Sequence, residues 1–311
     1  MERAPRRPFC ADISAETAEP LDATASRVDH WLLVEYRGLW NRDLLGGSLF
    51  SARLRSALSE QLAARPRSRL LFIRRPERRA REGRMIYLAS STEHGGTLDG
   101  LEVGNVDELL GLDLAAVARP VRHPLLVVCT HGKRDRCCAR YGRPLYDRLV
   151  DEAEEDWVWQ STHVGGDRFA GNLVCLPQGL YFGRVEAGDV WPLLDEYLAG
   201  RIYLERYRGR SCYSFAVQAA EHAVRAARGV RDIDDVRLVS SRRLGQDRWT
   251  IRLLVRSSGE VHEVAVEQED GELTYLTCDA DVLKHPRRYL AKRHRVVSRR
   301  RPEGSPREQG A

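Results

Sequence analysis

The sequence predicts an α/β fold, and three observations support this class. Apolar runs of strand length alternate with amphipathic helical stretches along residues 31–200. Hydrophobic residues make up 42% and charged residues 31% of the 311-residue chain, which is typical of a globular protein with an ordinary core. No apolar stretch of the sequence approaches the ~18–20 residues that a membrane span requires. A chain of this length can form more than one domain of ordinary size.

The N-terminal region, residues 1–118, is expected to form an α/β unit. Residues 1–27 show no periodicity and should form an extended arm with a short turn. The elements expected after this arm are a strand at 31–36, a helix at 51–64, strands at 69–73 and 84–88, and a short helix at 107–112. The helix is predicted from leucines at a spacing of four, which gives it one apolar face.

The middle region, residues 119–207, repeats this alternation more clearly. The expected elements are a strand at 125–128, a helix at 144–154, strands at 157–160, 173–176 and 180–185, and a helix at 190–198. Pro144 would occupy the first turn of its helix, where a missing N–H is tolerated. The β-α-β-β-β-α order matches a thioredoxin-like layout.

The C-terminal region, residues 208–297, predicts a small α+β module after a linker at 208–214. The module should contain a helix at 215–228 and four short strands at 236–240, 249–255, 261–267 and 273–277. A strongly basic run extends from Lys284 to Arg301, and we expect it to be solvated. Residues 298–311 are expected to form a disordered basic tail.

The composition of the chain indicates its cellular compartment and excludes some classes of binding partner. The chain has seven cysteines, an odd number, and its N-terminus lacks the apolar segment of a secretory signal, so we expect a cytoplasmic protein with reduced or metal-bound thiols. The net charge is +5, but arginines are interleaved with acids along most of the chain. This pattern favours a solvated surface over a phosphate-binding stripe, so neither a nucleic acid nor a membrane is an expected partner.

Two polar loops contain the candidate metal-binding residues, and each loop directly follows an expected strand. CTHGKRDRCC (129–138) follows the first strand of the middle region, and STHVGGDRFAGN (161–172) follows the second. Cys129, Cys138 and His163 are the ligand types that zinc and iron–sulfur sites use. Asp167 follows four residues after the histidine and would share its face if the loop turned helically. The two loops therefore predict a metal site.

Other interpretations of these residues are weaker. Three cysteines within ten residues of a basic, polar loop are unusual for ordinary core thiols. A thioredoxin-type redox pair would require C-x-x-C at a helix start, whereas the close pair here, Cys137 and Cys138, is vicinal. The chain also has no G-x-G-x-x-G fingerprint after a strand, so electrons for a redox centre would come from a separate protein.

The segments CTHGKRDRCC, HVGGDRFAGNLV and LPQGLYFGRV resemble the sucrase/ferredoxin-like family, which includes the fungal actin-patch-distal protein. The opening FCADIS and the region to about residue 200 are similar to its general layout. The resemblance implies a thioredoxin-like ferredoxin domain that holds a [2Fe–2S] cluster, with two cysteines on one iron and two histidines on the other. We find no paired-carboxylate site of a glycosidase.

Carried over by position, the resemblance implies Cys129 and Cys138 as the thiolate ligands and His163 as the first imidazole ligand. The second histidine of the family's H-x-G-G-H pattern falls on Asp167, and here the sequence departs from the family. A carboxylate can bind iron but is a harder, charged ligand. Asp167 is therefore the expected fourth ligand, and the alternatives are Cys137 first, then His131 or Cys175.

The expected function is that of a one-electron carrier or other redox protein with an unidentified reductase or acceptor as its partner. Two other classes stay open at this point. A thiol-dependent oxidoreductase would use the cysteines without iron, and a zinc-stabilised binding module would hold a metal without redox activity.

Overall fold

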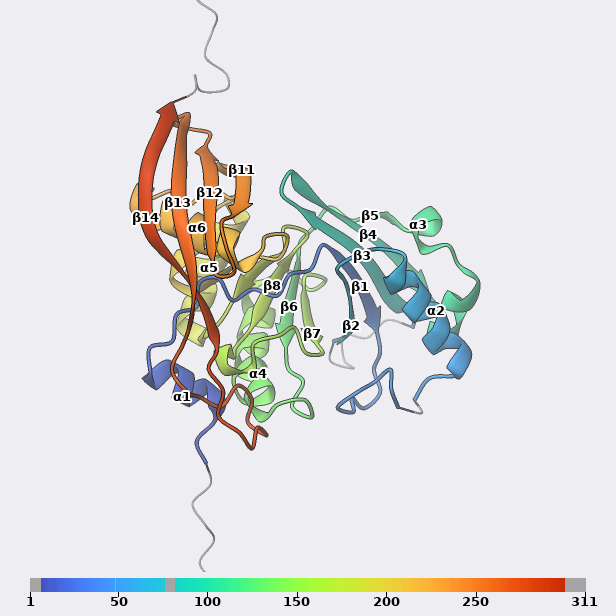
Figure 1. Cartoon of the computed structure of the whole chain (residues 1–311). Helices are drawn as coiled ribbons and strands as arrows, with labels where there is room; N and C mark the ends of the chain where they lie inside the picture. Colours follow the sequence, from blue (N-terminus) through green and yellow to red (C-terminus); the bar gives the residue numbers. More distant parts are fainter. Residues whose placement is uncertain (1–6, 48, 76–81, 300–311) are drawn as a thin grey trace, which may run out of the picture.

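The computed structural model describes residues 7–47, 49–75 and 82–299 (Figure 1). These residues form a ten-stranded mixed sheet and a separate four-stranded antiparallel sheet. Helices accompany both sheets, so the α/β fold class is confirmed. No helix in the described part of the chain is long and apolar enough to cross a membrane.

The large sheet has the strand order β10-β9-β8-β6-β7-β2-β1-β3-β4-β5. Its strands are β1 (His30–Glu35), β2 (Ser68–Arg74), β3 (Arg84–Thr92), β4 (Gly95–Val103), β5 (Arg119–Pro120), β6 (Leu125–Cys129), β7 (Val158–Ser161), β8 (Leu173–Leu176), β9 (Leu180–Phe182) and β10 (Tyr207–Arg210). The helices are α1 (Cys10–Glu16), α2 (Ala52–Ala63), α3 (Leu114–Val117), α4 (Arg136–Glu152), α5 (Val190–Leu198) and α6 (Phe215–Arg228).

The large sheet contains the same arrangement twice. In the N-terminal half, β1 and β2 are parallel and joined by α2, and β3 and β4 form an antiparallel hairpin beside β1. In the middle region, β6 and β7 are parallel and joined by α4, and β8 and β9 form the hairpin beside β6. The second copy has the β-α-β-β-β-α order that the sequence predicts, closed by α5.

The two halves join edge to edge through β2 and β7. These strands are antiparallel, with Ile73 opposite Ser161 and Arg74 opposite Gln160. The sheet is therefore continuous across the expected domain boundary at residue 118. Because both pairs lie at the carboxyl ends of their strands, the loop that follows β7 lies against the N-terminal half.

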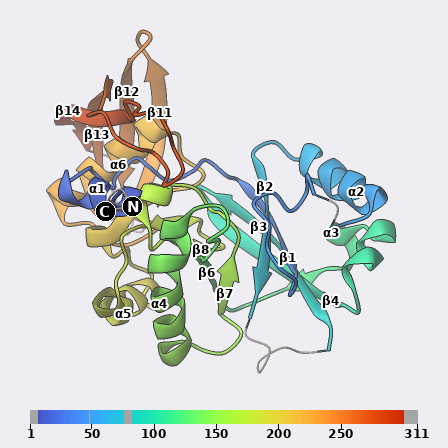
Figure 2. The same ribbon diagram turned by 90° about the horizontal axis from the view of Figure 1, so that it is seen from below.

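Strand β6 is buried along its whole length and contributes to two cores, since alternate side chains of a strand point to opposite faces. Leu126 and Val128 pack beneath α4 and α5. Leu125, Val127 and Cys129 pack in a second core that also contains residues of β1 and β2. Figure 2 shows α4 and α5 beside the β6–β8 part of the sheet and α2 beside the N-terminal strands.

The helix α4 begins at Arg136, eight residues before the expected start at residue 144. The Asp135 side chain accepts a hydrogen bond from the Cys137 N–H at 2.8 Å and caps the helix. Pro144 lies inside the helix instead of in its first turn. Position 142 of this helix favours glycine, because a Cβ there would lie only 2.0 Å from the carbonyl oxygen of Cys129 on β6. Cys137 and Cys138 therefore lie on a helix and not on a loop.

Several other elements also differ from the prediction. α1 forms where an extended arm was expected, and its seven residues are too few to show a period. β4 was not predicted, because Gly95, Gly96 and Gly100 weaken its strand pattern. β10 replaces part of the expected linker at 208–214, and its arginines Arg208 and Arg210 are each 1% exposed.

The C-terminal module has the order β11 (Val236–Arg243), β12 (Arg248–Val255), β13 (Glu260–Asp270) and β14 (Arg287–Arg299), packed on α6. The expected strand at 273–277 is wrong, and the fourth strand is instead part of the basic run. β14 is stable there because its cations face acids of β13, as Arg295 does with Glu263 at 2.6 Å. Residues 298 and 299 of the expected tail end this strand, and residues 300–311 lie outside the described part.

Candidate metal centre

The carboxyl ends of β6 and β7 bring the predicted ligands together. Cys129 ends β6 and His163 follows β7, and the two strands are parallel neighbours, so their carboxyl ends meet at one edge. The first turn of α4 places Cys138 at the same edge. The donor atoms of these three residues all lie within 4.8 Å of one another and could hold a metal ion.

The distances form a compact set. His163 Nδ1 lies 4.0 Å from Cys129 Sγ and 3.9 Å from Cys138 Sγ. Asp167 lies beside them, with Oδ1 3.0 Å from His163 Nδ1 and accepting a hydrogen bond from the Cys138 thiol at 3.3 Å. The structure therefore brings Cys129, Cys138 and His163 together as one set and places Asp167 in contact with His163 and Cys138.

The glycines of the second loop set the place of Asp167. Gly165 and Gly166 have φ values of +102° and +84°, which residues other than glycine rarely adopt. A Cβ on Gly166 would lie 2.4 Å from Nη2 of Arg208. Arg208 is buried and donates hydrogen bonds to the Gly165 carbonyl at 3.1 Å and to Asn172 Oδ1 at 2.7 Å. Arg208 thus holds the turn at Gly165 and Gly166 in place. Asp167 follows this turn as the first residue of a short 3₁₀ helix, Asp167–Phe169.

The centre is buried on its sulfur side and open on its imidazole side. Cys129 and Cys138 are at most 1% exposed, whereas the His163 side chain is 22% exposed. A pocket of about 430 Å³ opens beside His163 and is also lined by Phe72 of β2 and by Arg134. The imidazole edge is the part of the centre that an approaching partner can reach.

The four groups share protons. A hydrogen bond from Cys138, together with His163, holds the pKa of the Cys129 thiol well below its usual value in spite of burial. The same contact with Cys129, and burial, raise the pKa of Cys138 well above its usual value. Burial alone would lower the pKa of His163, but hydrogen bonds to Asp167 and Cys129 raise it to about 9. Metal binding would displace these protons.

The alternative fourth ligands lie elsewhere. The Cys137 sulfur is 3.6 Å from Cys10 Sγ and 3.2 Å from Cys278 Sγ, in a separate cluster. His131 lines the same pocket as His163, but its Nε2 lies 2.8 Å from the Asn41 carbonyl. Cys175 packs in the core beneath α4 and α5, and burial raises the pKa of its thiol.

The model of the sucrase/ferredoxin-like family matches residues 21–209, which is more than half of the chain and contains both metal-site loops. The chain belongs to the sucrase/ferredoxin-like family. This confirms the resemblance that the two loops indicated. The matched region ends within β10, so the C-terminal module lies outside it.

The chain is also similar to curated proteins from fungi. The chain is 36% identical over 96 residues to altered inheritance of mitochondria protein 32 of Meyerozyma guilliermondii. The aligned region covers 27% of this chain and 34% of that protein. It is 33% identical over 95 residues to the protein of the same name from Debaryomyces hansenii, over 27% of this chain and 35% of that protein. The chain thus spans about a third of the length of these relatives. No solved structure matches it.

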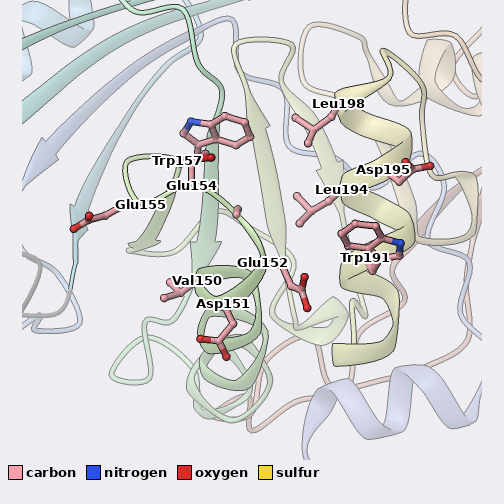
Figure 3. Close-up of a pocket in the computed structure, with 11 residues that line it drawn as sticks. Val150, Asp151, Glu152, Glu154, Glu155, Trp157, Trp191, Leu194, Asp195 and Leu198 are labelled. Atoms are coloured by element: carbon pink, nitrogen blue, oxygen red, sulfur yellow. The ribbon is translucent and has the colours of Figure 1, made fainter.

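A second pocket lies away from the metal-site residues of this family member. It is lined by acids from the end of α4 and the turn after it, among them Glu152 and Glu155, and by the indoles of Trp157 and Trp191 (Figure 3). The far end of α4 at Glu152 lies about 21 Å from Cys138 at the usual helical rise. None of the predicted ligands lines this pocket.

The sequence interpretation missed three residues with metal-binding side chains. Cys10, Asp135 and Cys278 form a buried cluster with Cys137. Cys10 and Cys278 are each isolated in the sequence, and no local spacing connects them. Asp135 does carry a local signal, because an aspartate directly before a helix is a common N-cap.

Proposed function

We propose that this protein transfers single electrons through a [2Fe–2S] cluster held by Cys129, Cys138, His163 and Asp167. One observation carries the proposal: two thiols, an imidazole and a carboxylate, from the end of β6, the first turn of α4 and the loop after β7, lie close together at one edge of the sheet. When bound, the cluster accepts and returns one electron. The chain supplies the ligands, the burial and the access route.

The donor set fits this group chemically. Thiolates are the ligands that iron–sulfur clusters use most, and imidazole replaces them on one iron in some clusters. The low pKa of Cys129 favours the thiolate form that binds metal. Burial alone would raise the pKa of Asp167, but its hydrogen bond with His163, and to a smaller extent the charge of Arg134, lower the pKa below its usual value. Both anionic ligands are thus available near neutral pH.

The carboxylate of Asp167 should affect the reduction potential of this centre. Asp167 adds one negative charge where a second imidazole would add none. A more negative surrounding disfavours the extra electron of the reduced state, so the reduction potential should be lower than that of a two-histidine site. This protein would then act toward acceptors as a stronger donor.

Access through the pocket defines how a partner would exchange electrons. His163 is the only one of the four ligands with a substantial exposed fraction, at 22% of its side chain. We infer that a separate redox protein docks over this pocket and that electrons pass at the imidazole edge. The cytoplasm is the compartment in which we expect this exchange, because its reducing conditions keep the thiols available.

A single zinc ion is the second candidate, favoured by the compact spacing. Tetrahedral zinc with Zn–S bonds of about 2.3 Å and Zn–N bonds of about 2.0–2.1 Å separates a sulfur ligand from an imidazole nitrogen by about 3.6 Å. The distances of 3.9 and 4.0 Å from His163 Nδ1 to the two sulfurs are close to that value. In that case the site would stabilise a binding module without redox activity.

Iron and sulfide analysis separates these functions. The protein is produced with ample iron and purified without oxygen or chelators, and we expect a red-brown protein with about two irons and two sulfides per chain. Cys129→Ser should abolish the colour, whereas Cys212→Ser, at a half-buried thiol outside both clusters, should not. If the protein contains stoichiometric zinc and takes up no iron on anaerobic reconstitution, the redox function is wrong and the zinc-stabilised binding module is supported. A colourless, metal-free protein that turns over with a thiol reductant would be an oxidoreductase.

A further inference from the structure

A second set of metal-binding side chains lies next to the first centre. Cys10 is the first residue of α1, Asp135 and Cys137 lie at the start of α4, and Cys278 lies between β13 and β14. The donor atoms of these four residues all lie within 4.8 Å of one another, and all four residues are at most 2% exposed. The cluster therefore joins three distant segments of the chain.

The sulfur atoms form a nearly even triangle. Cys10 Sγ lies 3.6 Å from Cys137 Sγ and 3.7 Å from Cys278 Sγ, and the third side measures 3.2 Å. The edge expected between thiolates on one tetrahedral zinc ion is about 3.8 Å. Asp135 Oδ2 completes the set at 3.9 Å from Cys10 Sγ.

We propose that Cys10, Cys137, Cys278 and Asp135 bind one zinc ion as a closed structural site. Three thiolates and a carboxylate provide four ligands of the types that zinc prefers, in the number that a closed tetrahedral site needs. The site differs from the first centre, where the imidazole faces a pocket. Full burial leaves no position for a substrate or a partner, so the ion has a structural role.

The carboxylate is held in place to face the three sulfurs. Asp135 is 1% exposed, and among the described residues it forms no ion pair with lysine or arginine. Its side chain accepts hydrogen bonds from the N–H groups of Cys137 at 2.8 Å and Cys278 at 2.7 Å, which orient it toward the sulfurs. When the thiols give up their protons to bind a metal, three thiolates and this carboxylate would be buried together, and a zinc ion supplies the positive charge that offsets them.

A disulfide explains the cluster less well. A disulfide joins two sulfurs and would leave the third thiol and Asp135 unused. Cys137 and Cys278 are the closest pair at 3.2 Å, but Cys10 Sγ lies only 3.6 and 3.7 Å from these two sulfurs, so all three are neighbours. A cation contacts all four residues at once.

The ion would also position the first centre. Cys137 and Cys138 are neighbours in the first turn of α4, so a bond that fixes Cys137 fixes the backbone that carries Cys138. Cys137 and Cys278 are 141 residues apart in sequence. A metal that closes such a long loop stabilises the folded chain by restricting the unfolded one.

Zinc analysis of a variant without the first centre tests the site separately from the proposed redox function. In full-length Cys129→Ser/Cys138→Ser, purified without chelators, we expect one zinc ion per chain. Cobalt added to that variant should give intense thiolate-to-cobalt absorption. In Cys10→Ser/Cys278→Ser we expect the stoichiometric zinc to be lost, while Cys212→Ser retains it as the control.

The opposite results are equally clear. Absence of both zinc and cobalt binding in folded Cys129→Ser/Cys138→Ser overturns the site. An intact mass two hydrogens lower, with two thiols missing on titration of the unfolded chain, overturns it in favour of a disulfide. If the double variants do not fold, the wild-type protein reconstituted with iron decides: with iron in the first centre it must still contain one zinc ion per chain, and its absence overturns the site.

Discussion

Cys137 and Cys138 are consecutive residues of α4, yet their sulfur atoms belong to two different clusters. Cys138 Sγ lies 3.9 Å from His163 Nδ1, and Cys137 Sγ lies 3.2 Å from Cys278 Sγ. Successive residues of a helix point about 100° apart, so one turn can serve two sites on adjacent sides. The first turn of α4 is therefore the common support of both proposed centres.

The first prediction separates the roles of Asp167 and Cys137. Asp167→Ala should shift or abolish the cluster absorption, because the carboxylate contacts both His163 and Cys138. Cys137→Ser should leave that absorption nearly intact and reduce the zinc content, because its sulfur faces the other cluster. Visible absorption and metal analysis of the two variants check this. The reverse pattern would assign the fourth cluster bond to Cys137.

The second prediction concerns the reduction potential. Asp167→His should raise it by on the order of 100 mV, because neutral imidazole stabilises the reduced cluster relative to a carboxylate. Protein-film voltammetry measures the shift directly. Arg168→Gln is the matched control, since Arg168 pairs with Glu19 at 2.9 Å and is adjacent to Asp167 in sequence. A potential that is unchanged or lower in Asp167→His would exclude Asp167 as a ligand.

The third prediction concerns the packing of α4 on β6. Gly142→Ala should lower the free energy of unfolding by about 1–3 kcal/mol, since its Cβ would lie 2.0 Å from the Cys129 carbonyl oxygen. In an unhindered helix the same change stabilises by up to about 1 kcal/mol. Gly188→Ala is the control, because a Cβ there meets no atom within 4 Å. Chemical denaturation measures both. Equal stability of the two variants would show that α4 can shift away from β6.

The fourth prediction concerns pH and the C-terminal sheet. His262 Nδ1 lies 2.7 Å from His294 Nε2, and burial lowers the pKa of both histidines, with Arg228 adding to this effect and Glu260 opposing it at His262. The unfolded chain takes up these protons near pH 6.5 and the folded chain only at lower pH, so stability falls as the pH drops below about 6.5.

The free energy of unfolding should therefore decrease between pH 7 and pH 5. Denaturation curves across this range measure it, and His262→Gln should flatten the slope. His222→Gln, which changes a histidine outside this pair, serves as the control. A slope that His262→Gln leaves unchanged would place the pH dependence on other groups.

Local signals made the first centre predictable. Cys129 and His163 each follow a short apolar run, and two such runs in a β-α-β order form parallel neighbours whose ends meet. The glycines before Asp167 indicated a tight turn, and the structure has positive φ values there. The family resemblance rested on the same two loops.

The second cluster could not be predicted in this way. Cys10 and Cys278 are far apart in sequence and meet only because α1 and the segment before β14 both pack against the start of α4. The expected helix start at residue 144 also left Cys137 on a loop, where its direction was undefined. The Asp135 cap, which starts the helix earlier, sets that direction.

The N-terminal half of the large sheet differs from the middle region at the corresponding strand end. β1 has the place in the N-terminal half that β6 has in the other, but it ends in Glu35 where β6 ends in Cys129. Glu35 pairs with Arg37 at 2.8 Å and accepts a hydrogen bond from the Met85 N–H at 2.9 Å. Its carboxylate is thus satisfied within the fold, and this copy of the arrangement has a structural strand end.

Electron paramagnetic resonance of the dithionite-reduced, anaerobically purified protein tests the central claim most directly. A [2Fe–2S] centre bound by Cys129, Cys138, His163 and Asp167 should give a spin-half signal that integrates to about one spin per chain and is lost in Cys138→Ser. A protein that contains stoichiometric metal at these residues but gives no such signal would contradict the account.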